Sequence, residues 1–366
     1  MKPDLVETVK HFTFEGDLLQ ASPHGFGHIN DTYVAHFRKA GGAIRRYILQ
    51  RINHNVFKNP EQVMQNIERV TSHLRKKIIA AGGDPERETL NLIRTVEGRT
   101  FHKTDDGNYW RAYLFIERAR TYQVVESLDH VHNATRAFGK FQKLLSDFPA
   151  GQLHESIPDF HHTRTRYGAL VEAVERDVKN RARSARAEIE FVQKRAEDTS
   201  VLVDLLEQGR LPERVTHNDT KFNNVMIDDQ TGEGICIVDL DTVMPGLSLY
   251  DFGDVIRSGA NPAAEDERDL AQVCIDLDIF DCIADAYLDA TRDFLTPAEM
   301  DLLPFSARLM TFECGMRFLT DHLDGDVYFK VHRENHNLDR CRTQFKMVRD
   351  MEEKLDQMLG IVRKYR

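Results

Sequence analysis

The chain has 366 residues, of which 41 % are hydrophobic and 30 % are charged, so it is long enough for two lobes with a sizeable core and lacks the composition of a disordered chain. Its formal net charge of −10 comes without a block of Lys and Arg residues, which argues against nucleic acid as a partner. The polar amino terminus does not resemble a signal peptide, and no window approaches the ~20 apolar residues of a membrane span.

The first part of the chain predicts antiparallel strands around one helix. Residues 23–52 indicate a strand, a turn that contains Gly25 and Gly27, and a second strand, because apolar and polar residues alternate and β-branched types are frequent. Between residues 63 and 74, apolar residues recur at helical spacing, and residues 110–116 predict a further strand.

Beyond Glu117 the pattern changes to helical periodicity, which continues to the carboxyl end apart from a hairpin region near residues 214–240. The change predicts an α+β fold with a small antiparallel lobe over residues 1–117, a hinge near residues 116–120, and a larger, mainly helical lobe over residues 118–366. The five cysteines contain no C-x-x-C pair, so we expect neither a zinc site nor disulfides, and a cytoplasmic location.

The candidate catalytic and metal-binding residues lie in the hairpin region near residues 214–240. His217 and Asp219 form a His-x-Asp triplet, Asn224 follows five residues later, and an apolar strand then ends on Asp239. Phosphoryl transfer needs this set, because one carboxylate orients or deprotonates a hydroxyl while an amide and a carboxylate hold Mg²⁺ against the phosphates of ATP. We predict Asp219 as the catalytic aspartate, Asn224 and Asp239 as metal ligands, and His217 as a structural residue that packs beneath the aspartate.

These motifs resemble the aminoglycoside phosphotransferase and choline kinase superfamily of protein-kinase-like enzymes. The amino-acid sequence of the motif region, from residue 215 to residue 254, is most similar to that of the N-acetylhexosamine 1-kinases. The likeness extends over nearly the whole chain. The segments that carry it are residues 27–33, 47–53, 215–228, 234–254 and 315–321.

The resemblance implies transfer of the ATP γ-phosphate to the anomeric hydroxyl of N-acetylglucosamine or N-acetylgalactosamine, with ATP and a small sugar as partners and a monomer or weak homodimer as the assembly. Other acceptors on the same fold stay open, namely choline, an aminoglycoside or homoserine. A binding module without activity is a further alternative, although it leaves the joint presence of Asp219, Asn224 and Asp239 unexplained.

Two further aspartates follow Asp239. Asp241 is a third candidate for the metal site, as a weaker ligand, with a role in supporting the metal ligands from behind or in forming a turn as its alternatives. Asp251 belongs to an Asp-Phe-Gly sequence, but it lies beyond a Pro-Gly turn and resembles a helix-start residue that braces the catalytic loop.

The nucleotide site draws on three segments of the small lobe. Gly25 and Gly27 are a fragment of a glycine-rich phosphate cover, which a simple hairpin turn would also explain. The third strand usually supplies a cation to the phosphates, and either Gln50 or Arg51 faces the cleft according to the register, with Arg51 as our candidate. The candidate for the glutamate that pairs with that cation is Glu68. The resemblance places adenine against the hinge near Phe115 and Glu117.

An acceptor site for a sugar needs directional polar groups and an aromatic or apolar face. The candidates, chiefly through the resemblance, are His28, Asp219, Arg317, Asp321 and Tyr328. Arg317 and Asp321 are four residues apart, so a surface ion pair on one helix is the alternative for them.

Overall fold

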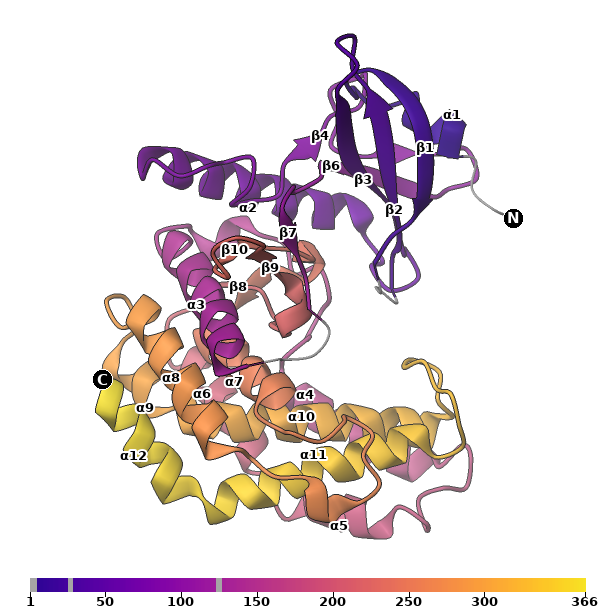
Figure 1. The fold of residues 1–366 in the computed structure, drawn as a ribbon. Coiled ribbons are helices and arrows are strands. Elements are labelled where there is room, and N and C mark those ends of the chain that lie inside the picture. Colours follow the sequence, from indigo (N-terminus) through magenta and orange to yellow (C-terminus); the bar gives the residue numbers. More distant parts are fainter. Residues whose placement is uncertain (1–4, 26–28, 123–126) are drawn as a thin grey trace.

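The structure is a computed structural model that describes residues 5–25, 29–122 and 127–366. It has a small β-rich lobe and a larger helical lobe, with a long helix, α2, between them (Figure 1). Within the described ranges, no helix combines the length and the apolar character that crossing a membrane requires.

The small lobe is an antiparallel sheet with strand order β1-β2-β3-β6-β4, and β5 pairs with β6 on a side branch. The elements of this lobe are α1 (Leu5–Val9), β1 (Asp17–Pro23), β2 (Asp31–Arg38), β3 (Ile44–Ile52), α2 (Pro60–Ala80), β4 (Leu92–Ile93), β5 (His102–Lys103) and β6 (Tyr109–Leu114). The predicted strands at residues 46–52 and 110–116 are therefore present, whereas most of residues 23–30 connects β1 to β2.

Successive side chains along each strand point to opposite faces of the sheet, so the two faces carry different residues. One face buries a small apolar core that includes Phe37, Leu49 and Trp110. Gln50 and Arg111 are cross-strand partners in the β3–β6 register, so both side chains lie on the opposite face. That second face looks toward α2 and the large lobe, where Arg111 donates to Gln50 of the same sheet and to Asp241 of the large lobe.

Helix α2 begins where Asn59 caps the first turn and Pro60 occupies its first position. Its apolar stripe, including Val63, Ile67 and Leu74, is buried in the same core as the helices of the large lobe. A buried amide reinforces this attachment, because Asn66 donates to the carbonyls of His154 at 2.7 Å and Val243 at 3.0 Å.

The chain passes between the lobes directly after β6. Leu114 is the last residue of the small sheet, and β7 (Ala119–Arg120) already pairs with β9 of the large lobe. Arg118 adopts a left-handed backbone at φ 56° within this short connection. We propose residues 115–118 as the hinge, a segment that overlaps residues 116–120 predicted from the sequence.

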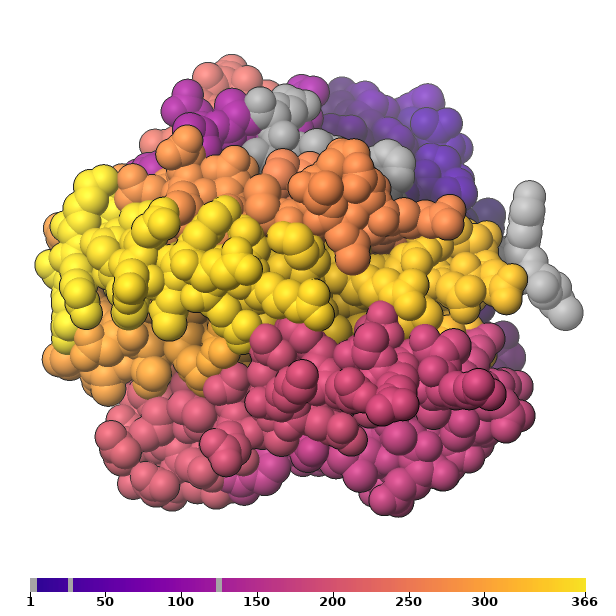
Figure 2. All heavy atoms as spheres, turned by 90° about the horizontal axis from the view of Figure 1, so that it is seen from below, coloured from indigo at the N-terminus to yellow at the C-terminus, as the bar shows by residue number. Residues whose placement is uncertain are grey.

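The large lobe packs its helices around one extended core (Figure 1). Its helices are α3 (Leu128–Leu144), α4 (Thr163–Arg176), α5 (Arg186–Gln193), α6 (Asp198–Glu207), α7 (Ser248–Gly259), α8 (Leu277–Thr291), α9 (Pro297–Asp301), α10 (Leu303–Asp324), α11 (His336–Glu353) and α12 (Leu355–Tyr365), with short 3-10 turns η1 (Ala150–Gln152), η2 (Phe222–Asn224), η3 (Leu240–Thr242) and η4 (Leu270–Gln272). Figure 2 shows the C-terminal helices, in yellow, running across the face opposite the small lobe.

Two short antiparallel strand pairs interrupt this helical lobe and carry the predicted motif. Strand β8 (Arg214–Thr216) pairs with β11 (Met244–Gly246), and β9 (Val225–Asp228) pairs with β10 (Gly234–Ile237). The loop between β8 and β9 and the turn after β10 therefore meet at one place below the small lobe.

Candidate active site

Residues 217–224 form the loop between β8 and β9, and helix α7 holds its first half. Asn218 has a left-handed backbone with φ 65°. The Asp251 carboxylate accepts the backbone N–H of His217 at 3.0 Å and that of Asn218 at 2.7 Å. The Asp254 carboxylate accepts the N–H of Thr220 at 2.8 Å. Asp251 therefore braces the loop from behind, which agrees with the role that the sequence suggests for it.

His217 supports the loop from within the core. Its Nδ1 accepts the N–H of Asp219 at 3.3 Å, while its Nε2 lies 3.0 Å from the carbonyl of Val238. Since a carbonyl only accepts, the ring carries its proton on Nε2. The ring packs edge-on against Phe138 and Phe141, which leaves it a structural position and no access to a substrate.

The Asp219 carboxylate lies between a cation and an amide. Lys221 Nζ is 2.7 Å from Asp219 Oδ1, and Asn224 Nδ2 is 3.2 Å from Asp219 Oδ2. Burial opposes the charge on Asp219, but the Lys221 ammonium outweighs it and lowers the pKa of Asp219 to about 2. The carboxylate is therefore ionised and ready to accept a proton or to orient a hydroxyl.

Asp239 follows β10 and faces the same loop. Its backbone is left-handed, with φ 58° and ψ 55°. The N–H of Val238 donates to the carbonyl of Asn224 at 2.9 Å, which brings the two chain segments together. Asp239 is exposed at its surface, but protein atoms at longer range reduce its hydration, and this effect together with the carboxylates of Asp241 and Asp219 raises the pKa of Asp239 to about 6.

The donor set of this site suits a hard divalent cation. Asn224 uses its amide nitrogen toward Asp219, so its amide oxygen is left for a ligand, and the Asp239 carboxylate is accessible. The neighbouring carboxylates disfavour a negative charge on Asp239 until a cation neutralises it. Mg²⁺ is usually held by one or two carboxylates together with substrate phosphates, so these two side chains fit it.

Asp241 has a different environment from Asp239. Its carboxylate forms a buried ion pair with Arg111 of β6 and accepts a hydrogen bond from Asn30 at 2.6 Å. Asn30 in turn accepts the N–H of Asn53 at 3.0 Å. Because small-lobe groups occupy both of its oxygens, Asp241 braces the two lobes, and this geometry favours the supporting role over direct binding of a metal.

The structure settles the register that the sequence leaves open on β3. Gln50 lies on the face toward the large lobe, where it accepts from Arg111 Nε at 3.0 Å and donates to Thr32 at 2.9 Å. Arg51 lies on the other face and forms a half-exposed ion pair with Asp31. The predicted partner Glu68 instead pairs with Arg94 at 2.5 Å. Neither Arg51 nor Glu68 therefore has the placement that we expected.

The hinge candidates Phe115 and Glu117 lie together beside Arg46. The Arg46 guanidinium stacks 3.9 Å above the Phe115 ring and pairs with the Glu117 carboxylate. Arg87 donates to the Glu117 carbonyl at 3.0 Å and pairs with the buried carboxylate of Asp228 at 2.7 Å, which ties the connection to β9. A cavity of about 540 Å³ is lined by these residues.

The glycine-bearing turn is described only in part. Gly25 has φ 77°, a conformation that glycine adopts without strain, and a Cβ there would meet nothing within 4 Å. Gly27 and His28 lie outside the described residues, so their predicted roles stay predictions.

The acceptor candidates of α10 and the loop after it surround one guanidinium. Arg317 lies 4.9 Å from the ring centroid of Phe160, 6.0 Å from that of Tyr328 and 5.6 Å from that of Phe329. Its nearest carboxylate is Glu313, at 3.9 Å, so the expected alternative of an ion pair with Asp321 does not occur.

Asp321 binds the backbone of the loop after α10 and does not pair with Arg317. Its carboxylate accepts the backbone N–H groups of Val327, Tyr328 and Phe329 at 2.8–2.9 Å, and Asn337 donates to it at 2.8 Å. Asp321 therefore holds the loop that presents Tyr328, whose side chain is exposed.

Three residues of the site are not among the sequence-based candidates. Lys221 lies two residues after Asp219, a spacing that would have revealed it as a neighbour of the carboxylate. Arg111 and Glu313 carry no local signal, because a charged residue within an apolar strand or helix is visible as unusual only when its burial is known.

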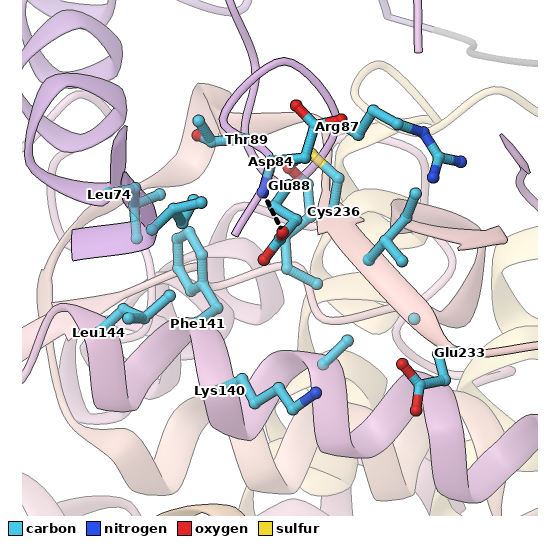
Figure 3. A pocket seen from close by; sticks show the side chains of 15 residues that line it. Leu74, Asp84, Arg87, Glu88, Thr89, Lys140, Phe141, Leu144, Glu233 and Cys236 are labelled. Atoms are coloured by element: carbon cyan, nitrogen blue, oxygen red, sulfur yellow. Dashed lines mark hydrogen bonds between the residues drawn. The ribbon is translucent and has the colours of Figure 1, made fainter. Parts of the chain in front are cut away.

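A second cavity, of about 250 Å³, lies apart from the catalytic loop (Figure 3). Its lining comes from the end of α2, residues 84–89, α3 and β10, and the side chains of Phe141 and Cys236 are among those drawn there. None of the predicted site residues lines it.

Comparisons with known proteins agree with this geometry. A protein-family model described as the phosphotransferase enzyme family (APH) matches residues 20–281, which include both of these strand pairs and the catalytic loop. Among solved structures, the chain is similar to an aminoglycoside phosphotransferase from Alicyclobacillus acidocaldarius, with 13 % identity, a TM-score of 0.58 and coverage of 100 % of this chain and 96 % of that one.

It is also similar to a choline kinase from Cryptosporidium parvum, with 12 % identity, a TM-score of 0.56 and coverage of 94 % and 92 %. A microcompartment-associated aminopropanol kinase matches with 13 % identity, a TM-score of 0.55 and coverage of 96 % and 97 %. At such identities the likeness concerns the fold, and it confirms the expected two-lobed α+β architecture. Since the family model matches well over half of the 366 residues, the chain belongs to the phosphotransferase enzyme family.

Proposed function

We propose that this phosphotransferase is a small-molecule kinase that moves the γ-phosphoryl group of ATP to the anomeric hydroxyl of an N-acetylhexosamine. The observation that carries the kinase part is the convergence of Asp219, Asn224 and Asp239 on one place between the lobes. The sugar part rests on the sequence resemblance and on the charge of the acceptor region.

Each side chain of the loop has a distinct task in this proposal. Asp219 is ionised and accepts the proton of the acceptor hydroxyl, which an anomeric hydroxyl releases more readily than an ordinary alcohol. Asn224 and Asp239 hold Mg²⁺, which when bound neutralises charge on the phosphates. Lys221, at 2.7 Å from the Asp219 carboxylate, places a positive charge beside the position where the phosphoryl group is transferred.

The nucleotide is proposed to lie between the hinge and the catalytic loop. Adenine meets the backbone near Phe115 and Glu117, and the turn that begins at Gly25 covers the phosphates. Arg111, on the sheet face toward the large lobe, is the cation that we propose near the phosphates in place of Arg51, because Arg51 lies on the opposite face.

The acceptor region favours an uncharged polyhydroxyl substrate over a cationic one. A cage of aromatic rings is the usual receptor for a quaternary ammonium, but here Phe160, Tyr328 and Phe329 already surround the guanidinium of Arg317. Arg166 adds a second positive charge nearby, and its pKa is lowered by burial and by Arg317. A cationic acceptor would be repelled, whereas sugar hydroxyl and acetamido oxygens accept hydrogen bonds from arginine.

A phosphoryl-transfer assay with a panel of acceptors tests the proposal. The panel contains N-acetylglucosamine, N-acetylgalactosamine, free hexoses, choline, homoserine and kanamycin, and NMR locates the phosphate on the product. We expect transfer to the C1 hydroxyl of an N-acetylhexosamine. Transfer to choline or kanamycin instead would overturn the assignment of the acceptor and keep the kinase.

The Asp219→Asn variant is the control for the chemistry. It keeps the size of the side chain but cannot accept a proton, so we expect ATP binding to persist and turnover to fall by about 10²- to 10⁴-fold. Turnover near that of the native protein would contradict the role of Asp219.

A further inference from the structure

A buried histidine connects the catalytic loop to helix α10. His161 Nδ1 lies 2.9 Å from Glu313 Oε1, and His161 Nε2 lies 3.0 Å from the carbonyl oxygen of Asn218. Both side chains are enclosed, with 8 % of His161 and 1 % of Glu313 exposed. The imidazole therefore bridges a carboxylate of the large lobe and the residue that precedes Asp219.

The proton count of this bridge follows from its partners. The Asn218 carbonyl can only accept, so His161 Nε2 must carry a proton. Burial opposes ionisation of Glu313, but His161, Arg317 and Arg166 outweigh it, so that the pKa of Glu313 lies below its ordinary value. The 2.9 Å contact between His161 Nδ1 and Glu313 Oε1 also needs a proton, and because Arg317 and Arg166 favour the ionised carboxylate, we assign that proton to Nδ1, so that the pair consists of an imidazolium and a carboxylate.

The Asn218 peptide is the part of the loop that needs support. Its left-handed backbone, with φ 65°, is uncommon for a residue with a side chain and persists only when neighbouring groups hold it. The carboxylate of Asp251 holds the N–H of Asn218 at 2.7 Å, and His161 holds its carbonyl. The Asn218 side chain adds a hydrogen bond to the carbonyl of Thr242 at 2.9 Å.

We propose that His161 and Glu313 form a charged pair that positions Asp219 by holding the carbonyl of Asn218. His161 and Glu313 are positioning residues in this view, and the inference rests on the proposed catalytic role of Asp219. The Asp251 carboxylate holds the N–H of Asn218, and the His161 ring holds its carbonyl. With both backbone groups of Asn218 held, the direction of the next side chain, that of Asp219, is fixed.

The same pair borders the proposed acceptor site. Glu313 Oε1 is 3.9 Å from Arg317, and Glu313 Oε2 is buried with no hydrogen-bond partner among the described residues. One carboxylate thus faces both the arginine that we assign to the acceptor and the imidazole that holds the catalytic loop. This arrangement connects Arg317 of the proposed acceptor site and the Asn218 carbonyl, next to Asp219, to one buried pair of side chains.

Nitrogen NMR of the labelled histidines tests the charge state without any substrate. The His161→Gln variant identifies the His161 signals among the 16 histidines. At neutral pH we expect protons on both ring nitrogens of His161 in the native protein, and loss of the Nδ1 proton in Glu313→Gln. An unprotonated Nδ1 in the native protein would overturn the proposal.

Steady-state kinetics with ATP, Mg²⁺ and N-acetylglucosamine test the positioning role. His161→Leu removes the donor to Asn218, so we expect kcat to fall by about 100-fold, the scale of a misplaced catalytic group, with KM for ATP unchanged. His161→Gln can still donate to the carbonyl and should recover part of this loss, although both variants lose the charge.

His162→Gln is the matched control, because His162 caps helix α4 through the N–H of Thr165 at 3.2 Å and does not touch the loop. We expect His162→Gln to lower the melting temperature and to leave kcat unchanged. Equal kcat losses in His161→Gln and His161→Leu, or losses confined to KM for ATP, would contradict positioning. If the native protein transfers phosphate to no acceptor, the proposed function fails, and the NMR result still decides whether the charged pair exists.

Discussion

Two carboxylates of the site differ in pKa because their neighbours differ. Asp219 lies beside Lys221, so its pKa falls to about 2 despite its burial. The side chain of Asp239 is exposed, but the nearby protein and the carboxylates of Asp241 and Asp219 disfavour its charge, so its pKa rises to about 6. The first group thereby stays ionised at neutral pH and can orient a hydroxyl, and the second is suited to take up a cation that relieves its unfavourable charge.

This difference leads to a prediction about stability and pH. Between the ordinary value of 3.8 and about 6, folded Asp239 holds a proton that the unfolded chain releases, so the free energy of unfolding of the metal-free protein decreases as the pH rises through this window. At neutral pH we expect Asp239→Asn to raise the melting temperature of the metal-free protein and to abolish the further rise that Mg²⁺ and ATP cause.

Thermal unfolding with and without Mg²⁺ and ATP measures both effects. Asp241→Asn is the control, and we expect it to lower the melting temperature. The substitution removes the negative charge that pairs with the buried guanidinium of Arg111. A lower melting temperature for metal-free Asp239→Asn, or a retained response to Mg²⁺, would contradict the assignment.

Among the elements, helix α7 shows why an Asp-Phe-Gly sequence occurs outside the metal site. Asp251 braces the catalytic loop, Phe252 is fully buried, and Gly253 lies against helix α10. A Cβ on Gly253 would clash with the side chain of Met310 and would lie 2.5 Å from the Ser306 carbonyl oxygen. The glycine is therefore required by helix packing.

We expect Gly253→Ala to destabilise the protein by about 1–3 kcal/mol, because α10 must move away from α7. Gly168 is the matched control: it lies inside α4, and a Cβ there would have nothing within 4 Å, so Gly168→Ala should stabilise by about 0.5–1 kcal/mol through the lower entropy of the unfolded chain. Urea unfolding measures both changes. Equal effects of the two substitutions would show that packing is not the cause.

At the scale of the whole molecule, the two lobes are joined by more than the hinge. Helix α2 belongs to the small lobe in sequence but buries its apolar face in the core of the large lobe. Asn30 and Arg111 of the small lobe both bind the carboxylate of Asp241, which lies two residues after the proposed metal ligand Asp239. Movement of the small lobe is therefore mechanically connected to the position of Asp239.

Limited proteolysis tests this connection. When ATP, Mg²⁺ and N-acetylglucosamine are present, we expect slower cutting near residues 20–55, because closure of the lobes protects the hairpin. Asn30→Ala should make cutting there faster in the absence of ligands. Asn108→Ala serves as control, since Asn108 bonds Asp106 at 2.8 Å in the turn before β6, away from Asp241. Cutting that neither ligands nor Asn30→Ala alters would argue against closure.

Much of this architecture follows from local features of the chain. Alternation predicts β3 and β6, four-residue spacing predicts α2, and the break in period near residue 117 coincides with the passage between the lobes. The His-x-Asp triplet and its following Asn are close in sequence, so one short loop brings Asp219 and Asn224 together whatever the rest of the fold does.

The sequence by itself indicated the catalytic loop, the division into a β-rich and a helical lobe, and the kinase class, because these depend on patterns within a few tens of residues. Only the tertiary structure decided which side of β3 faces the cleft, that Arg111 and Asn30 engage Asp241, that Glu68 pairs with Arg94, and that His161 reaches the loop from Glu313. These contacts join residues far apart in the chain, and a charged side chain selects its partner by proximity and burial, which no local pattern encodes.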